Sequence, residues 1–143
     1  MTGIDFYFNA SDCLQVACRL AAKAVARRQR IVIHAPQPDT AQRIDRMLWT
    51  WPATGFVPHC AVHDALAPDT PVLIGAAGDA PPGCELLLNL SPECPPQFAR
   101  FERLLEVIGT EEAERQAGRS RYRFYLDRGY RIAAHDLAAA EGK

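Results

Sequence analysis

The chain has 143 residues, of which 48% are hydrophobic and 23% are charged, and its formal net charge at pH 7 is −1. This length fits one domain, expected to span residues 1–143, and the charge gives no support to a protein that wraps duplex DNA. The charge is uneven, because residues 115–131 contain six arginines and one acid and the rest is net acidic. Partners of opposite charge could therefore meet different faces.

The cysteines and the N-terminus are typical of a cytoplasmic protein. The five cysteines are odd in number and form no C-x-x-C pair, so free thiols are expected. The opening Met-Thr-Gly-Ile-Asp lacks the basic and apolar regions of a signal peptide. No apolar run approaches the roughly 20 residues that cross a bilayer, so we expect no membrane partner.

The sequence of the first half of the chain predicts two successive units, each a strand followed by a helix. Apolar residues alternate in the strands and recur at three- and four-residue steps in the helices, the first of which follows the cap residues 9–12. The expected elements are a strand at 4–8, a helix from about 12 to 28, a strand at 30–35, a helix that follows the turn at 36–39 and reaches about Trp51, and a proline-containing loop at 52–71.

The second half predicts three more strands and a helix rich in arginine. Short apolar runs bounded by glycine and proline are typical of buried strands in a parallel sheet. The expected elements are strands at 71–75 and 85–90, a short helix at 95–101, a strand at 104–108, a helix that opens at 109–111 and ends at Gly129, and a tail at 130–137 with weak extended character. Residues 131–143 are expected to be loosely ordered.

Alternating strands and helices of these lengths predict a three-layer α/β fold with a mostly parallel sheet. Such folds often bind nucleotides at the turn after the first strand, which here is Asn9-Ala10-Ser11-Asp12. Neither G-x-G-x-x-G nor G-x-x-x-x-G-K-[ST] occurs in the chain, and Asp12 would repel a phosphate. We expect no bound nucleotide and no other cofactor.

A run of possible ligands, His59, Cys60, His63 and Asp64, lies in the segment expected to be a loop. A zinc site would need further ligands that no spacing fixes, from Cys84, Cys94 or His135. Cys60 beside His59 also suggests a thiol nucleophile in a small α/β enzyme, although adjacency alone does not create hydrogen-bonded geometry. Ordinary polar residues are the favoured interpretation, with no metal.

The densest aromatic group is Trp49, Trp51 and Phe56, with Val57 beside them. These side chains could cover one end of the sheet as part of the core. Alternatively, aromatic residues exposed near a proline-containing loop act as anchors at protein interfaces. Their exposure to solvent distinguishes the two interpretations.

The arginine-rich helix places five residues on one side. At about 100° per residue they fall within an arc of roughly 100°: Arg115, Arg119, Tyr122, Arg123 and Leu126. Ala113, Ala117 and Phe124 lie roughly 160–200° from Arg115 and are expected to form the buried side. Arginines on a helix can simply be solvated. With a tyrosine among them, they also suit an anionic ligand that has an apolar part.

Two stretches resemble the chi subunit of bacterial DNA polymerase III. Residues 48–59 have the pattern L-W-x-x-P-x-x-x-F-V-P-H, and residues 119–125 have R-x-R-Y-[KR]-x-Y. The opening Ile4-Asp5-Phe6-Tyr7-Phe8 is similar to the same family, and the likeness runs from about residue 3 to 132. The resemblance implies a Rossmann-like fold that binds no nucleotide, and a non-catalytic accessory of the clamp-loader complex.

The resemblance also implies a partner for the arginine helix. Family members hold the C-terminal tail of single-stranded DNA-binding protein, which is acidic and ends in Pro-Phe with a free carboxylate. By resemblance, Arg119 pairs with that carboxylate, Tyr122 and Arg123 line the pocket, Arg115 attracts the aspartates and Ile108 forms the floor. Leu126 stands where family members can carry another basic residue, which reduces the expected electrostatic attraction.

A second implied partner is the psi subunit, or another clamp-loader subunit. We expect this contact at the 49–59 segment, through Trp49, Trp51, Phe56, Val57, Pro58 and His59. Contact with DNA would then be indirect. The alternative is a direct binder of single-stranded nucleic acid that uses the arginine helix, where neutralisation of phosphates supplies the affinity.

Overall fold

The computed structural model describes residues 1–50 and 57–138, within which the chain forms seven strands, three α-helices and three 3-10 turns. In chain order the strands and helices are β1 (Gly3–Ala10), α1 (Cys13–Ala26), β2 (Ile31–His34), α2 (Pro38–Thr50), β3 (His59–Ala61), β4 (Val72–Gly75), β5 (Leu86–Asn89), β6 (Arg103–Gly109), α3 (Glu112–Asp127) and β7 (Ile132–Asp136). The turns are η1 (Ala67–Asp69), η2 (Ala77–Asp79) and η3 (Phe98–Arg100). None of the described helices has the length and apolar character of a membrane span.

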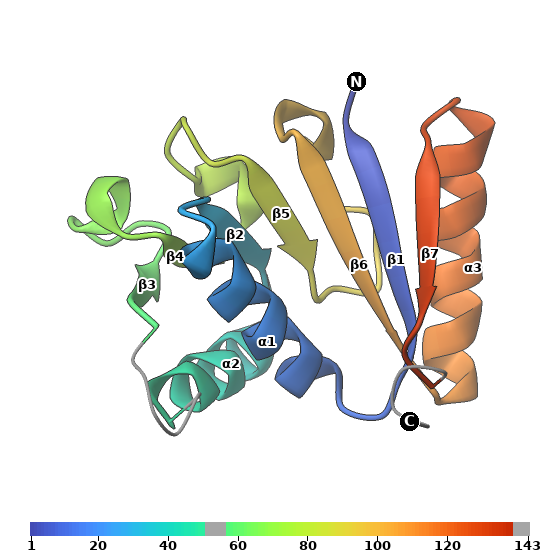
Figure 1. Ribbon diagram of the computed structural model, residues 1–143, viewed down its shortest axis with the longest axis horizontal. Helices are drawn as coiled ribbons and strands as arrows, with labels where there is room; N and C mark the ends of the chain where they lie inside the picture. Colours follow the sequence, from blue (N-terminus) through green and yellow to red (C-terminus); the bar gives the residue numbers. More distant parts are fainter. Residues whose placement is uncertain (51–56, 139–143) are drawn as a thin grey trace.

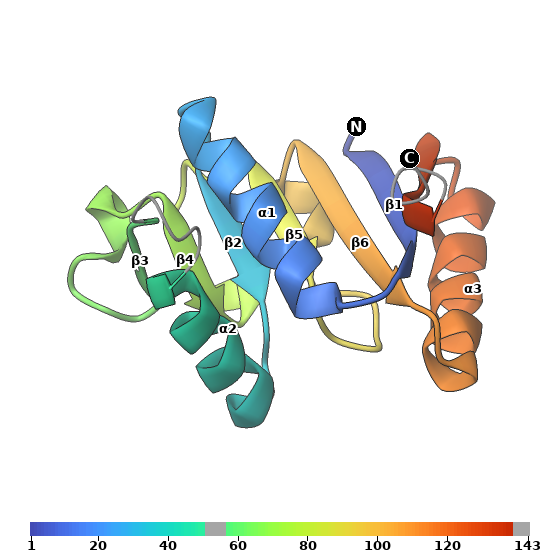
Figure 2. The ribbon, with the colours of Figure 1, turned by 60° about the horizontal axis from the view of Figure 1, so that its bottom comes forward.

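The seven strands form one sheet in the order β3-β4-β2-β5-β6-β1-β7, and all neighbouring strands run parallel (Figure 1). Helices α1 and α2 lie side by side on one face, where α1 contacts β2 and β6 and α2 contacts β3 and β4 (Figure 2). Helix α3 packs on the opposite face, at the β7 end of the sheet. The predicted three-layer α/β fold is confirmed.

The central strands are apolar on both faces because both faces are covered. Ile33 and Leu88 pack in the core beneath α1 and α2. Their neighbours along the chain, Val32 and Leu87, point to the opposite face and belong to the core that includes Tyr125 of α3. This two-sided burial accounts for continuous apolar runs where a half-exposed strand would alternate.

The turn between β1 and α1 is closed by a side chain. Oδ1 of Asp12 accepts hydrogen bonds from the amides of Leu14 and Gln15, both at 3.1 Å. An aspartate at the N-cap satisfies the first free amides of the helix and places a negative charge there. In a nucleotide-binding turn these amides would face a phosphate.

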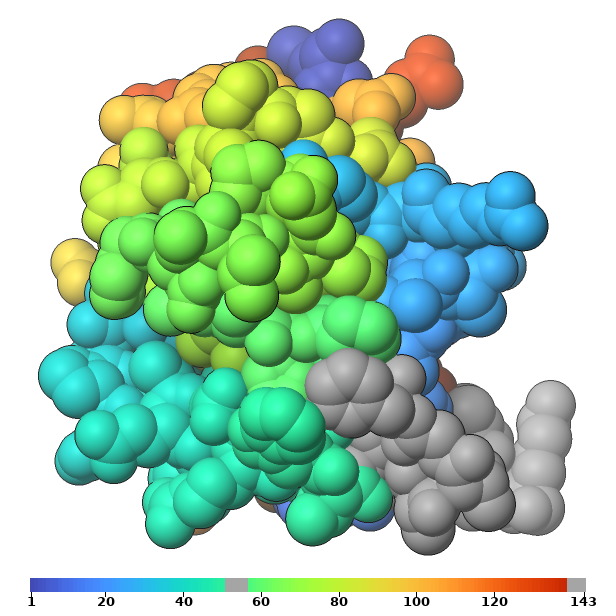
Figure 3. All heavy atoms as spheres, turned by 90° about the vertical axis from the view of Figure 1, so that its left-hand side faces the viewer, coloured from blue at the N-terminus to red at the C-terminus, as the bar shows by residue number. Residues whose placement is uncertain are grey.

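One strand was not expected from the sequence, and another was indicated only as weak extended character. β3 lies inside the segment predicted to be a loop, at the sheet edge beside α2 (Figure 3). Its three residues are too few to show an alternating pattern. The short helix predicted at 95–101 is only the 3-10 turn η3.

The other strand, β7, falls within the tail at 130–137 that was predicted to have weak extended character, and it is ordered by pairing with β1 although loose order was expected from residue 131. Its residues pair in parallel with β1, from Ile4 with Ile132 to Phe8 with Asp136. Its side chains include those of Ala133, Ala134 and His135, which are small or polar, so the sequence shows no alternation of large apolar residues here. The part of the tail at 139–143 lies outside the described residues.

Helix α3 buries a different side from the one predicted. Ala113 is exposed, whereas the buried residues are Gly118, Arg121 and Tyr125. At about 100° per residue, this buried line lies roughly a quarter turn from the predicted one. The cause is polar, because Arg121 and Tyr125 both reach a carboxylate inside the protein.

That carboxylate is Glu106 of β6, which is completely buried. Its Oε1 is 3.0 Å from Nε of Arg121, and its Oε2 accepts a 2.6 Å hydrogen bond from the Tyr125 hydroxyl. Nδ2 of Asn89 donates to the same carboxylate at 3.0 Å, and Arg121 also donates to the carbonyl of Pro92 at 2.8 Å. Burial raises the pKa of Glu106, while Arg121 and the hydrogen bonds from Tyr125 and Asn89 oppose the rise.

Replacing Arg121 by methionine should lower the free energy of unfolding by about 3–5 kcal/mol, because the buried carboxylate loses its cation. The loss should shrink as the pH falls from about 8 to 5. Without Arg121 the pKa of Glu106 in the folded state rises further above its unfolded value, so the folded state binds the proton more tightly and gains stability in acid. Urea unfolding followed by circular dichroism measures both effects.

The matched control is Arg123→Met, which removes an exposed arginine from the same helix and should change stability by less than about 0.5 kcal/mol. A loss in Arg121→Met that does not vary with pH would show that the charge on Glu106 is not its cause.

Candidate functional site

One cavity brings together every residue predicted for the arginine-helix site. It has a volume of about 550 Å³ and lies between α3 and the carboxyl-terminal parts of β1, β6 and β7. Its lining includes Ile108, Arg115, Arg119, Tyr122, Arg123 and Leu126. We call it the α3 pocket. Ligands of open α/β sheets commonly bind outside the carboxyl ends of the strands, so its position is a usual one.

The floor of the α3 pocket is apolar. Phe6 and Phe8 contribute from β1 and Ile108 from β6. The ring of Tyr122 meets Phe6 edge to face with 5.2 Å between centroids, and it is still partly exposed. Leu126, with 53% of its surface exposed, extends this apolar surface towards solvent. A ligand ring could therefore be buried against carbon on several sides.

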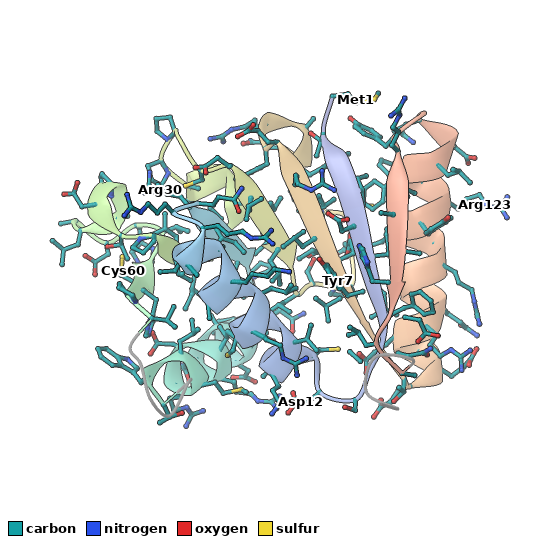
Figure 4. The ribbon with its side chains drawn as sticks, viewed as in Figure 1. Met1, Tyr7, Asp12, Arg30, Cys60 and Arg123 are labelled. Atoms are coloured by element: carbon teal, nitrogen blue, oxygen red, sulfur yellow. The ribbon has the colours of Figure 1, made fainter. Side chains whose placement is uncertain are left out.

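The rim of the pocket carries three arginines and one acid, Asp127, so its net charge is positive. Arg119 is 3.6 Å from Glu112, but both side chains are almost two-thirds exposed, so solvent weakens this ion pair. Within residues 1–50 and 57–138, Arg115 and Arg123 form no ion pair. Figure 4 shows Arg123 extending from α3 to the outside of the molecule. The guanidinium groups are thus available to an anion.

Two backbone features shape the pocket. A Cβ atom at Gly118 would lie 2.8 Å from Cδ1 of Ile108, so glycine lets α3 approach β6 closely. At the end of β1 the pairing with β6 shifts its register, and Asn9 adopts a left-handed φ of 62°. The side chain of Asn9 donates to Asp136 of β7 at 2.9 Å, which ties two strand ends beside the pocket.

Comparison with known families matches residues 1–133 to the family described as DNA polymerase III chi subunit, HolC. The chain belongs to this family. A Pseudomonas aeruginosa protein named DNA polymerase III subunit chi is 38% identical over 144 residues, covering 96% of this chain and 98% of the relative. Proteins of the same name from Haemophilus influenzae and Escherichia coli are each 26% identical, covering 93% and 90% of this chain and 96% and 85% of their own.

The resemblance to the chi family read from residues 48–59 and 119–125 is therefore confirmed. Sequence reasoning did not identify the part of the pocket that this chi-family chain takes from its sheet, namely Phe6, Phe8, Asn9, Gly109 and Ala134. The alternation of Phe6 and Phe8 at the end of the first strand was the available signal. It could not be used without knowing that β1 lies between β6 and β7.

The histidine and cysteine run begins on β3 and continues into the segment that follows it. His59 lies on β3, not in a loop, with Nδ1 2.7 Å from the Val57 carbonyl and Nε2 3.2 Å from Asp45. The groups at these distances from the two ring nitrogens are the Val57 carbonyl and the Asp45 carboxylate, and neither is the Cys60 thiol that a nucleophile would require. No group of three His, Cys, Asp or Glu side chains in the described ranges could hold a metal ion.

The predicted aromatic contact surface is only partly exposed. Trp49, at the end of α2, is 60% exposed and its ring meets that of His59 edge to face at 5.0 Å. Val57 is buried and belongs to the core beneath α1 and α2, which for this residue corresponds to the core interpretation and not to an exposed anchor. Pro58 is half-buried. Trp51 and Phe56 lie outside the described residues.

Proposed function

We propose that this chi-family chain binds the acidic C-terminal tail of single-stranded DNA-binding protein in the α3 pocket. In this role it is a non-catalytic accessory that connects the polymerase III clamp-loader complex to the coated single strand. The observation that supports the proposal is the combination, in one cavity, of three exposed arginines and an apolar floor. A tail that ends in phenylalanine and a free carboxylate needs both.

The two halves of such a ligand match different parts of the pocket. The phenylalanine ring would lie on Phe6, Phe8 and Ile108, and burying it contributes about 1.5–3 kcal/mol. The terminal carboxylate would accept two hydrogen bonds from the guanidinium of Arg119, a geometry worth roughly 1.5–3 kcal/mol. Arg115 and Arg123 would attract the preceding aspartates, an effect that salt screens.

The expected affinity is moderate. Ordering a flexible tail costs free energy, and the carboxylate contact is made at an exposed rim. These terms together leave binding in the micromolar range. A contact of this strength can form and dissociate repeatedly as the replicase moves.

A second contact, with psi or another clamp-loader subunit, is proposed at the Trp49 surface. This surface consists of the end of α2 and the neighbouring β3 segment (Figure 3). It lies at the β3 end of the sheet, whereas α3 lies at the β7 end (Figure 1). The two partners would therefore bind without competing.

Arg119→Ala should weaken binding of a labelled tail peptide by roughly tenfold or more, because the terminal carboxylate loses its guanidinium partner. Fluorescence polarisation measures the affinity. Amidating the peptide terminus should weaken binding to the parent protein similarly but should cost little in Arg119→Ala, since both changes remove the same interaction.

The control for this experiment is Arg46→Ala, which removes an exposed arginine from α2 and should leave the affinity unchanged. Unchanged affinity in Arg119→Ala would contradict the proposal. A different result would favour direct nucleic-acid binding by α3: an oligonucleotide competes with the peptide for the parent protein, and Arg119→Ala loses affinity for the oligonucleotide as well.

Leu126→Arg should increase tail affinity about two- to fivefold at low salt, because it adds a cation to the rim at a solvent-exposed position. The gain should disappear at high salt. Leu126→Gln is the uncharged control, and polarisation titrations at two salt concentrations measure both. A gain that persists in high salt would show that the added charge does not act by long-range attraction.

Trp49→Ala should weaken binding of purified psi subunit by about 1–2 kcal/mol, because an exposed tryptophan is a frequent anchor at interfaces. Isothermal titration calorimetry measures the loss, and tail-peptide affinity should not change. Leu66→Ala, at another exposed apolar position, is the matched control. Equal psi affinity in Trp49→Ala and the parent would remove this surface from the proposal.

A further inference from the structure

A second hollow lies on the sheet face opposite α3. Helices α1 and α2 lie on this face, and α1 crosses its middle without extending over β1 and β7 (Figure 1). A cavity of about 270 Å³ occupies the space beside the C-terminal half of α1. We call it the β1 cradle; the lining residues that matter below are Asp5, Tyr7, Lys23, Arg27, Arg103 and His135.

The β1 cradle contains a stacked pair of rings. Tyr7 of β1, labelled in Figure 4, and His135 of β7 stack with 4.6 Å between centroids and 19° between ring planes. Nε2 of His135 is 3.1 Å from Oδ1 of Asp5, which fixes the orientation of the imidazole. The His135 side chain remains 44% exposed, so ring surface is open to solvent.

The charge of the cradle is positive. Its one lining carboxylate, Asp5, accepts two hydrogen bonds from Arg103, at 2.9 Å from Nε and 2.6 Å from Nη2. Among the described residues Lys23 and Arg27 form no ion pair, and both are exposed. Three permanent cations thus face one carboxylate that is already paired.

Arg27 is close enough to the rings to act on them. Burial raises the pKa of the Tyr7 hydroxyl, Asp5 adds to the rise, and Arg103 and Arg27 oppose it. Arg27 of α1 and Arg103 of β6 therefore lie close enough to Tyr7 of β1 to act on its hydroxyl.

We infer that the β1 cradle is a second binding site, which takes a segment of single-stranded nucleic acid. Lys23 and Arg27 contact phosphates, and an unpaired base stacks on His135. Proteins that bind single strands without sequence preference combine these two elements, a cationic groove and aromatic platforms. This inference does not depend on tail binding in the α3 pocket.

The ring pair favours a nucleic acid over an acidic peptide. An acidic peptide without aromatic residues could use the cations but has no ring to place on the imidazole. A duplex is also disfavoured, because its bases are already stacked and paired. The α3 pocket has a different lining. Its floor is apolar, and the rings of Phe6 and Tyr122 meet there edge to face and are not stacked.

The test is anisotropy of a labelled oligothymidylate of about 15 nucleotides at low salt. The parent should bind, and K23Q/R27Q should bind roughly tenfold more weakly. Because each phosphate contact to a single strand contributes about 0.7 to the slope of log K against log salt, the double variant should lower that slope by about 1.4. His135→Ala should weaken binding with the slope unchanged, and His135→Phe should restore it.

The charge-matched control is R19Q/R46Q, which removes two exposed arginines from α1 and α2 outside the cradle. Circular dichroism melts confirm that each variant is folded. The inference is overturned if the parent shows no binding at low salt, or if the control loses as much affinity as K23Q/R27Q. It is also overturned if a polyglutamate peptide of equal charge competes as well as the oligonucleotide, or if Arg119→Ala abolishes oligonucleotide binding.

Discussion

The buried carboxylate of Glu106 is the constraint on which the orientation of α3 depends. A carboxylate without exposed surface must be matched by donors, and here the principal donors, Arg121 and Tyr125, come from one helix. This requirement fixes the rotation of α3 about its axis. It also holds the helix against β6 at the place where Gly118 allows close contact.

The α3 pocket is a consequence of that rotation. With Gly118, Arg121 and Tyr125 turned inward, the neighbouring arc of the helix lies along the ends of β1, β6 and β7 and faces the pocket. Tyr122 is the residue at the boundary, since its ring contacts Phe6 on one side and solvent on the other. Had Ala113 and Phe124 formed the buried side, the arginines would point away from the sheet and would have no apolar floor beside them.

The sequence was sufficient for the parts of the fold that rest on local patterns. The long helices, the four apolar strands after the first helix and the cap at Asp12 follow from periodicity and from residue chemistry. β3 was missed because it has only three residues, and β7 was indicated only as weak extended character because its side chains are small and polar and its contacts with β1 come from far along the chain. Arg121 was counted among six arginines, and nothing local distinguishes the buried one from the exposed ones. Its role depends on Glu106, which the fold places opposite to it.

The position of β1 has a consequence for the order in which the protein forms during synthesis. β1 is made first, but its neighbours in the sheet are made last, since Gly3 pairs with Arg103 and Ile4 with Ile132. Both edges of β1 remain unpaired until β6 and β7 have been synthesised, and pairing between segments so distant in sequence is slow. The α3 pocket takes its floor from that first strand and its rim from α3. A ribosome-bound chain can therefore contain a finished β2, α2 and β4 and still lack the pocket entirely.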